Sequence, residues 1–193
     1  MMPARATTRT VWAASCVWLI ALLSIAPANA QREQAYASLK EIRERGVVMQ
    51  QWETSCAAAT IATVLTYGFG DAVSEAIIVA GMLKKSDAVT IKKQGGFTLL
   101  DMKHYVEDRG YTGRAYKHLS LNDLKAFQAP IVPIDNYGYN HYVVFNGVKD
   151  DEVFLADPAF GNRKMRLSQF NKVWMDGMAF VVTPKRKNDK APE

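Results

Sequence analysis

The stretch that decides the fold is residues 50–65, QQWETSCAAATIATVL. Its second half is apolar enough for a buried helix, and its first half is polar, with Thr54 and Ser55 as N-cap candidates. Cys56 is therefore predicted in the first turn of this helix, where unpaired backbone amides and the helix dipole favour an anion such as a thiolate. The pattern predicts a cysteine nucleophile, and the alternative is a lone cysteine that serves as a small buried apolar residue.

The first 30 residues have the pattern of a secretory signal peptide. Two arginines precede an apolar run over 11–25, and residues 28–30, ANA, form a cleavage site of the A-x-A type. The apolar run is shorter than the roughly 20 residues that span a bilayer, so we expect cleavage rather than retention as an anchor. The mature chain should begin at Gln31 and reside in the periplasm, without an integral membrane segment.

Removal of this segment changes the cysteine count and the charge. Cys16 is lost with residues 1–30, and Cys56 is the one cysteine left, so no internal disulfide can form. A single thiol in an oxidising compartment is usually buried or used chemically. The net charge of +5 falls to +3, because the removed segment contains two arginines and no acidic residue. We expect the basic tail, 185–193, to be disordered.

The sequence contains no zinc-finger spacing, phosphate loop or RNA-binding signature. No nucleic-acid partner, metal or cofactor is therefore predicted.

The chain after residue 30 begins with helical periodicity and then changes to short strands. The predicted helices are 36–45, the segment that begins at Cys56, 72–85, 99–109 and 120–127. Thr98 and Ser120 are the predicted caps of the last two, and 86–94 is predicted as a surface loop. Runs rich in Val, Ile and Phe predict strands over 131–134, 141–145, 153–156 and 178–182. This order predicts one α+β domain over 31–184, with helices packed on an antiparallel sheet.

His141 and Asp157 lie in consecutive predicted strands. A three-residue hairpin loop flanked by Gly147 and Asp151 would place their side chains directly opposite each other. They would share a face with four apolar residues, Val143, Phe145, Val153 and Leu155. Asp157 would then orient one imidazole nitrogen and leave the other to take a proton from Cys56. The alternative is that His141 and Asp157 only hydrogen-bond to each other at the rim of the sheet and have no catalytic role.

Three separated elements resemble the bacteriocin-processing peptidases, papain-like cysteine peptidases that cleave leader peptides after a double glycine. They are Gln-x5-Cys at Gln50 and Cys56, HYVV at 141–144 and ADP at 156–158, and the resemblance covers about 47–182. It implies the papain-like fold, with Cys56 as the nucleophile. It also implies that His141 and Asp157 complete the triad and that Gln50 helps to form the oxyanion hole.

Most members of that family form the front domain of an ATP-driven exporter. With its signal peptide, this chain resembles the exported, stand-alone branch, which includes the peptidase of functional-amyloid secretion. It departs from the family at Ser55, where an acid is frequent, and at Ala57, where glycine is frequent. The implied partner is an exported protein or leader peptide, such as a fibre subunit or a secretion component.

Four aromatic residues lie close in sequence to Gln50, His141 or Asp157, namely Trp52, Tyr137, Tyr139 and Phe160. At the rim of a cleft they would narrow it, so that small residues, preferably glycine, fit beside the scissile bond. Alternatively, they pack the sheet edge. Two other functions stay open at this point: a non-catalytic binding module with the peptidase fold, and an acyl-transfer enzyme of the transglutaminase or amidase type.

Overall fold

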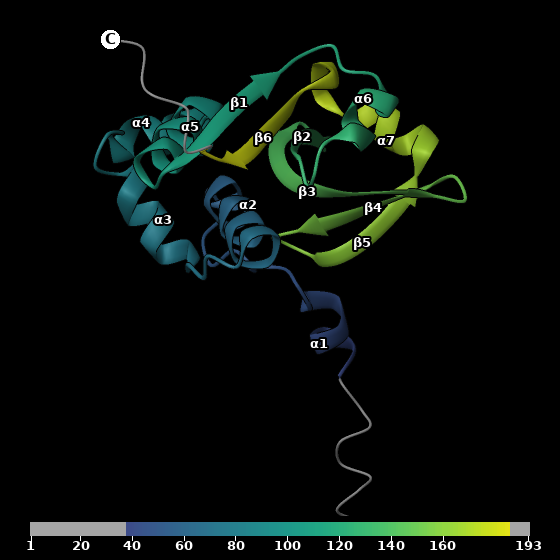
Figure 1. Ribbon diagram of the computed structural model, residues 1–193, viewed down its shortest axis with the longest axis horizontal. Helices are drawn as coiled ribbons and strands as arrows, with labels where there is room; N and C mark the ends of the chain where they lie inside the picture. The colour runs from purple at the N-terminus through teal and green to yellow at the C-terminus, as the bar shows by residue number, and fades with distance from the viewer. Residues whose placement is uncertain (1–37, 186–193) are drawn as a thin grey trace, which may run out of the picture. The chain divides into compact units, whose positions relative to one another are not determined.

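The computed structural model describes residues 38–185, and this part of the chain contains seven α-helices and a six-stranded sheet (Figure 1). The helices are α1 (Leu39–Glu44), α2 (Cys56–Thr63), α3 (Glu75–Met82), α4 (Ala88–Gln94), α5 (Leu99–Asp108), α6 (Leu121–Ala126) and α7 (Leu167–Val173). A π-helical turn, Val64–Gly68, extends α2, and a 3-10 turn, Met175–Gly177, follows α7. The predicted signal peptide, 1–30, and residues 186–193 of the predicted tail lie outside the described residues.

Local capping chemistry decides where two of the helices begin. The Thr98 side chain accepts from the backbone N–H of Asp101, and the Asp101 carboxylate accepts from the backbone N–H of Thr98, so α5 starts with a capping box. Ser120 and Asp123 form the same box at the start of α6. Each box satisfies two backbone donors that the helix itself leaves unpaired. The predicted caps of both helices are confirmed.

The prediction of a surface loop over 86–94 was wrong, because this segment contains α4. Asp87 starts the helix by accepting a hydrogen bond from the backbone N–H of Thr90 at 2.8 Å. Ile91 is its buried residue, and Gly95 follows its last turn in the left-handed conformation, with φ of 83°. A two-turn helix with one buried apolar residue has almost no periodic signal in its sequence.

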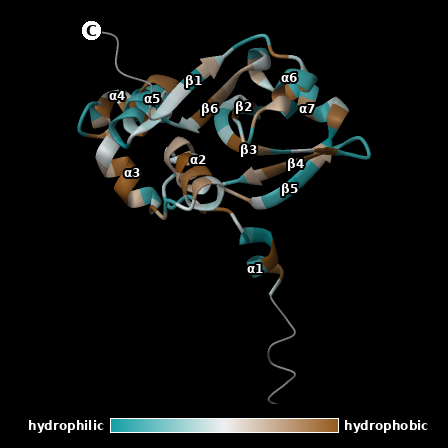
Figure 2. Cartoon of the chain, in the orientation of Figure 1, coloured by the Kyte–Doolittle hydropathy of each residue, from teal (hydrophilic) through white to brown (hydrophobic). Residues whose placement is uncertain are grey.

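The six strands form one antiparallel sheet in the order β1-β6-β2-β3-β4-β5. Their bounds are β1 (Tyr111–Tyr116), β2 (Ile131–Asn136), β3 (Tyr139–Lys149), β4 (Glu152–Asp157), β5 (Gly161–Arg166) and β6 (Ala179–Pro184). The four predicted strands correspond to β2, β3, β4 and β6. The two that sequence reasoning missed, β1 and β5, are the edge strands, and Figure 2 shows that β5 is mostly hydrophilic.

Apolar side chains cover both faces of the sheet. One cluster joins α2, α3 and α5 to the sheet and includes Ile61, Met102 and Val144. A second cluster lies against α6 and α7 and includes Val143, Leu124 and Phe170. Consecutive strand residues point to opposite faces, and Val143 and Val144 divide between the clusters accordingly. The predicted α+β fold, with helices packed on an antiparallel sheet, is confirmed. Within residues 38–185, no helix is both long and apolar enough to cross a membrane.

Candidate active site

Cys56 is the first residue of α2, and only 3% of its surface is exposed. Ser55 occupies the N-cap position, as predicted, but its side chain makes no capping hydrogen bond. Its Oγ donates to the carbonyl of Trp52 at 2.7 Å instead. The first-turn N–H groups of α2 are therefore not occupied by the Ser55 side chain. Because such groups and the helix dipole attract negative charge, this position suits a thiolate.

His141 and Asp157 are in contact, as the sequence predicts, but through a different strand register. The hairpin turn is formed by Asp150 and Asp151, which have φ of 51° and 62°, and β3 carries a bulge between Phe145 and Gly147. The pairing Val144↔Ala156 places Asp157 beside Val143 rather than directly opposite His141. The predicted direct pairing was wrong by two positions. A shift of two residues keeps a side chain on its face, so the pair still forms diagonally.

The hydrogen bond between His141 Nε2 and Asp157 Oδ1 is 2.8 Å long, and both side chains are buried. Burial has the largest influence on the pKa of His141 and lowers it. Hydrogen-bonding interactions with Asp157 and with Cys56 outweigh the burial and raise the pKa of His141 to about 9. At neutral pH the imidazole is therefore protonated, and Asp157 and Cys56 are the partners that favour its charged form. The structure brings together the three residues that the sequence singled out.

The two carboxylate oxygens of Asp157 have different partners. Besides His141, Oδ1 accepts from the backbone N–H groups of Ala159 at 2.8 Å and Phe160 at 3.3 Å. Oδ2 lies 2.7 Å from Nε of Arg163, in an ion pair that does not meet hydrogen-bond geometry. Burial raises the pKa of Asp157, but His141 and Arg163 outweigh it and hold the pKa below its usual value. Asp157 is therefore a carboxylate at neutral pH.

Gln50 is fixed between the Asp157 loop and the loop that leads into Cys56. Its backbone N–H donates to the carbonyl of Pro158 at 2.8 Å. Its side-chain Nε2 donates to the carbonyl of Trp52 at 3.0 Å, while the carbonyl of Glu53 is 3.5 Å away. One N–H of the amide is thus well bonded, and the other has only a long contact.

Glu75 is a buried acid that sequence reasoning missed. It is the first residue of α3, is 1% exposed, and both its oxygens accept from the backbone N–H of Gln51 at 3.0 Å. Glu75 therefore fixes the backbone of the loop between Gln50 and Cys56, and the Gln51 residue itself is exposed. An acid inside an apolar helical pattern was the signal that could have identified it. In the described part of the chain, no three His, Cys, Asp or Glu side chains are grouped as metal ligands.

Of the four aromatics from the sequence, Trp52 lies within the loop before Cys56 and Tyr139 lies against it. Trp52 lines a cavity of about 510 Å³ together with apolar side chains that include Val79 of α3, Ile91 of α4 and Leu83, which follows α3. The Tyr139 hydroxyl donates its one proton to the carbonyl of Gly95 at 2.8 Å, and the carbonyl of Glu53 lies 3.3 Å from the same hydroxyl oxygen. It therefore fastens the start of β3 to two loops.

Tyr137 and Phe160, the other two aromatics, line a separate cavity of about 360 Å³ with Arg163. Tyr137 is fully exposed and Phe160 is half exposed. The narrow cleft itself stays a prediction.

The chain matches the model of the peptidase C39 family over residues 44–187. The probable functional amyloid protease FapD of Pseudomonas aeruginosa is 36% identical over 151 residues, which cover 76% of this chain and 66% of that protein. The protein of the same name from Pseudomonas fluorescens is 33% identical over 161 residues, covering 83% of this chain and 70% of that protein. The chain thus spans about two thirds of the length of these curated relatives.

Solved structures agree on the fold. The peptidase domain of Streptococcus ComA, a bifunctional ABC transporter, superposes with a TM-score of 0.60 at 22% identity, covering 72% of this chain and 98% of that domain. A double-glycine motif protease of an AMS/PCAT transporter, solved with its leader peptide, gives a TM-score of 0.56 at 23% identity, covering 72% of this chain and 91% of that one. The chain belongs to the peptidase C39 family, and the prediction of a cysteine peptidase related to the double-glycine peptidases is confirmed.

Proposed function

We propose that this protein is a periplasmic cysteine peptidase that cleaves an exported protein or leader peptide after small residues. The observation that carries the proposal is the placement of Cys56 at a helix start beside His141, which a buried carboxylate holds by a 2.8 Å hydrogen bond. In the reaction, the Cys56 thiolate attacks the scissile carbonyl and forms a thioester. The His141 imidazolium gives its proton to the leaving amine, and Asp157 keeps the ring in orientation. Water then hydrolyses the thioester, with His141 as the general base.

The oxyanion of the tetrahedral intermediate needs donors that are already in place. We assign this role to the backbone N–H of Cys56 and to the side-chain amide of Gln50. The amide makes one good hydrogen bond to Trp52, and its second N–H, whose contact to Glu53 is long, is the donor that we assign to the developing charge. The ties of Gln50 to Pro158 and of Gln51 to Glu75 keep this loop rigid.

The substrate proposal rests on the relatives and on the close packing around the loop that leads into Cys56. FapD is described as a probable functional amyloid protease, and the AMS/PCAT protease was solved with a leader peptide. In this chain Tyr139 bridges the loops at Glu53 and Gly95, and a Cβ at Gly96 would lie 3.0 Å from the carbonyl oxygen of Thr54. Such close packing favours an extended segment with small residues beside the cut, in an exported partner such as a fibre subunit or secretion component.

Cleavage of a peptide library is expected to occur after Gly or Ala about 10 to 200 times more efficiently than after Phe, Leu or Arg. A large side chain would need the space that Tyr139 and the Gly95 loop occupy. Tyr139→Ala should relax this preference, whereas Tyr139→Phe, which keeps the ring and loses only the hydroxyl contacts, should relax it less. Mass spectrometry of the products measures the preference. Efficient cleavage after Phe, Leu or Arg by the unmodified protein would contradict the narrow cleft.

The pH profile of kcat/KM is expected to fall on its basic side near pH 9. The folded pKa of His141 is raised to about 9, so the imidazolium needed by the leaving amine persists through neutral pH and is lost as the pH rises through that value. The sign is the same for stability. The raised pKa of His141 contributes to the free energy of unfolding. This contribution is fully present below the ordinary histidine pKa of about 6.5 and is lost as the pH rises toward 9. Peptide hydrolysis between pH 5 and 10 tests this, and a basic limb near pH 6.5 would contradict it.

The proposed periplasmic location is supported by the signal-peptide pattern of residues 1–30, which lie outside the described residues. We expect the mature protein to begin at Gln31. Mass spectrometry of the N-terminal peptide from a periplasmic extract measures this directly. Recovery of residues 1–30 with the membrane pellet would show that the segment is an anchor instead.

A further inference from the structure

The Asp157 carboxylate has a partner in the neighbouring edge strand. Strand β5 pairs with β4 so that Gly161 faces Asp157 and Arg163 faces Leu155. Arg163 is two residues from Gly161, so it lies on the Asp157 side of the strand, diagonal to that residue. Its Nε is 2.7 Å from Oδ2 of Asp157, which is itself completely buried.

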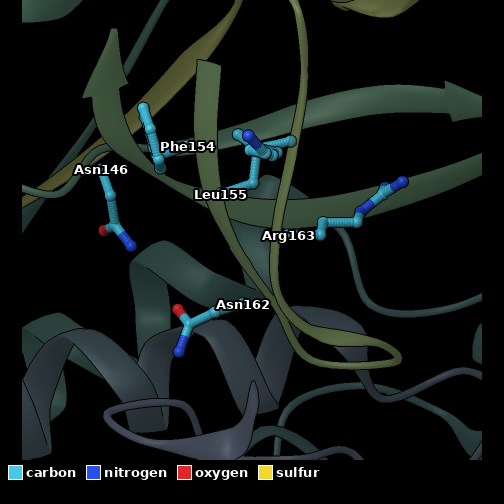
Figure 3. Close-up of a pocket in the computed structure, with 6 residues that line it drawn as sticks. Asn146, Phe154, Leu155, Asn162 and Arg163 are labelled. Atoms are coloured by element: carbon cyan, nitrogen blue, oxygen red, sulfur yellow. The ribbon is translucent and has the colours of Figure 1, made fainter. Parts of the chain in front are cut away.

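The surroundings hold the Arg163 side chain in this position. Figure 3 shows it pointing away from the side chain of Asn162, its neighbour in β5. The guanidinium carbon lies 5.5 Å from the ring centre of Phe160, at the distance of a cation–π contact. The side chain is 29% exposed, so the guanidinium is partly shielded from water.

The division of partners between the two oxygens has a geometric consequence. Oδ1 is hydrogen-bonded to His141 and accepts from two backbone N–H groups. Among the described residues, Oδ2 forms an ion pair with Arg163. A carboxylate can rotate about its last side-chain torsion, which is a soft, two-fold one. Without Arg163, the buried, negatively charged Oδ2 would have no positive charge beside it. This would favour rotation or protonation of the Asp157 carboxylate.

We propose that Arg163 is a positioning residue, which holds the Asp157 carboxylate in the plane that directs Oδ1 to His141. This inference rests on the proposed function, because its consequence for catalysis depends on the Cys56–His141–Asp157 arrangement. Arg163 acts through Asp157 and is not assigned any contact with the substrate. Sequence reasoning did not find it, since its importance comes from a pairing between strands.

The kinetic test compares three variants. Arg163→Gln removes the charge and should lower kcat about 100-fold, the size expected when a catalytic group is displaced by about 1 Å, with little change in KM. Arg163→Lys keeps a cation and should recover most of that loss. Lys164→Gln is the matched control, because Lys164 pairs with the partly exposed Glu152 on the other side of β5 and should leave kcat unchanged. A rise in KM with unchanged kcat after Arg163→Gln would overturn the proposal.

A second measurement is independent of peptidase activity. The His141 ring can be followed by ¹⁵N NMR, in which the proton on Nε2 reports the hydrogen bond to Asp157. Arg163→Gln should shift or broaden this signal, and Lys164→Gln should not. If the unmodified protein cleaves peptides but Arg163→Gln changes neither kcat nor the signal, the positioning role is wrong while the proposed function stands. If no peptide is cleaved but Arg163→Gln alters the signal, the positioning role holds and the proposed function fails.

Discussion

Cys56→Ala is expected to lower peptide cleavage about a million-fold, to the level of the background reaction, which is the loss typical of removing a nucleophile. No other cysteine exists after residue 30 to replace it. The variant should fold, because the change removes one sulfur atom from a helix start that is followed by three alanines. Hydrolysis rates for a Gly-containing peptide and a thermal melting curve, measured on the same preparation, separate loss of chemistry from loss of folding.

The same variant distinguishes the competing functions. A protein that only binds its partner would keep its full biological effect after Cys56→Ala, and the unmodified protein would not be labelled by a thiol-reactive amide warhead. An acyl-transfer enzyme of the transglutaminase or amidase type would lose activity like a peptidase, since it uses the same nucleophile. Adding a primary amine as an alternative acyl acceptor distinguishes the peptidase from the acyl-transfer enzyme. A peptidase should give mainly the hydrolysed product, and an amine adduct as the main product would contradict the peptidase proposal.

Local features of the fold could be predicted because they depend on a few neighbouring residues. The capping boxes at Thr98 and Ser120 need only an aspartate three residues later, and both helices begin where that pattern occurs. The α4 helix was missed because its one buried residue, Ile91, leaves no periodic trace. Strand β5 was missed for a related reason, since an edge strand in contact with water can be polar and is defined by its pairing to β4.

The candidate site could likewise be predicted only in part. Cys56, His141 and Asp157 could be named from motifs, but their register could not, because a bulge after Phe145 and a turn at Asp150 and Asp151 are invisible in the alternation of side chains. The side chain contact survived the error because the shift was an even number of residues.

Unlike Cys56, His141 and Asp157, the residues Arg163 and Glu75 could not be named from any motif. Both act through contacts with residues distant in sequence or through backbone atoms, to which no short motif corresponds.

Gln50→Ala is expected to lower kcat by about 100- to 1000-fold, the usual effect of losing one oxyanion donor, with a much smaller change in KM. The reason is that the amide contributes only when negative charge develops on the carbonyl oxygen. Gln51→Ala is the matched control. The exposed side chain of Gln51 is lost, but its backbone N–H keeps both contacts to Glu75, so the loop should keep its shape. Initial-rate kinetics with one peptide substrate compare the two.

Gln50→Glu sharpens this test because it preserves the size of the side chain while it replaces the donor by an acceptor. If the Gln50 side chain were needed only to fill the space beside the Trp52 and Glu53 carbonyls, the glutamate variant should work better than the alanine variant. If Gln50 stabilises the oxyanion, the negative carboxylate of the glutamate variant would repel the negative charge that develops on the carbonyl oxygen. The glutamate variant should then be at least as slow as the alanine variant. A large loss for Gln51→Ala with near-normal Gln50→Ala would instead assign the donor to the neighbouring residue.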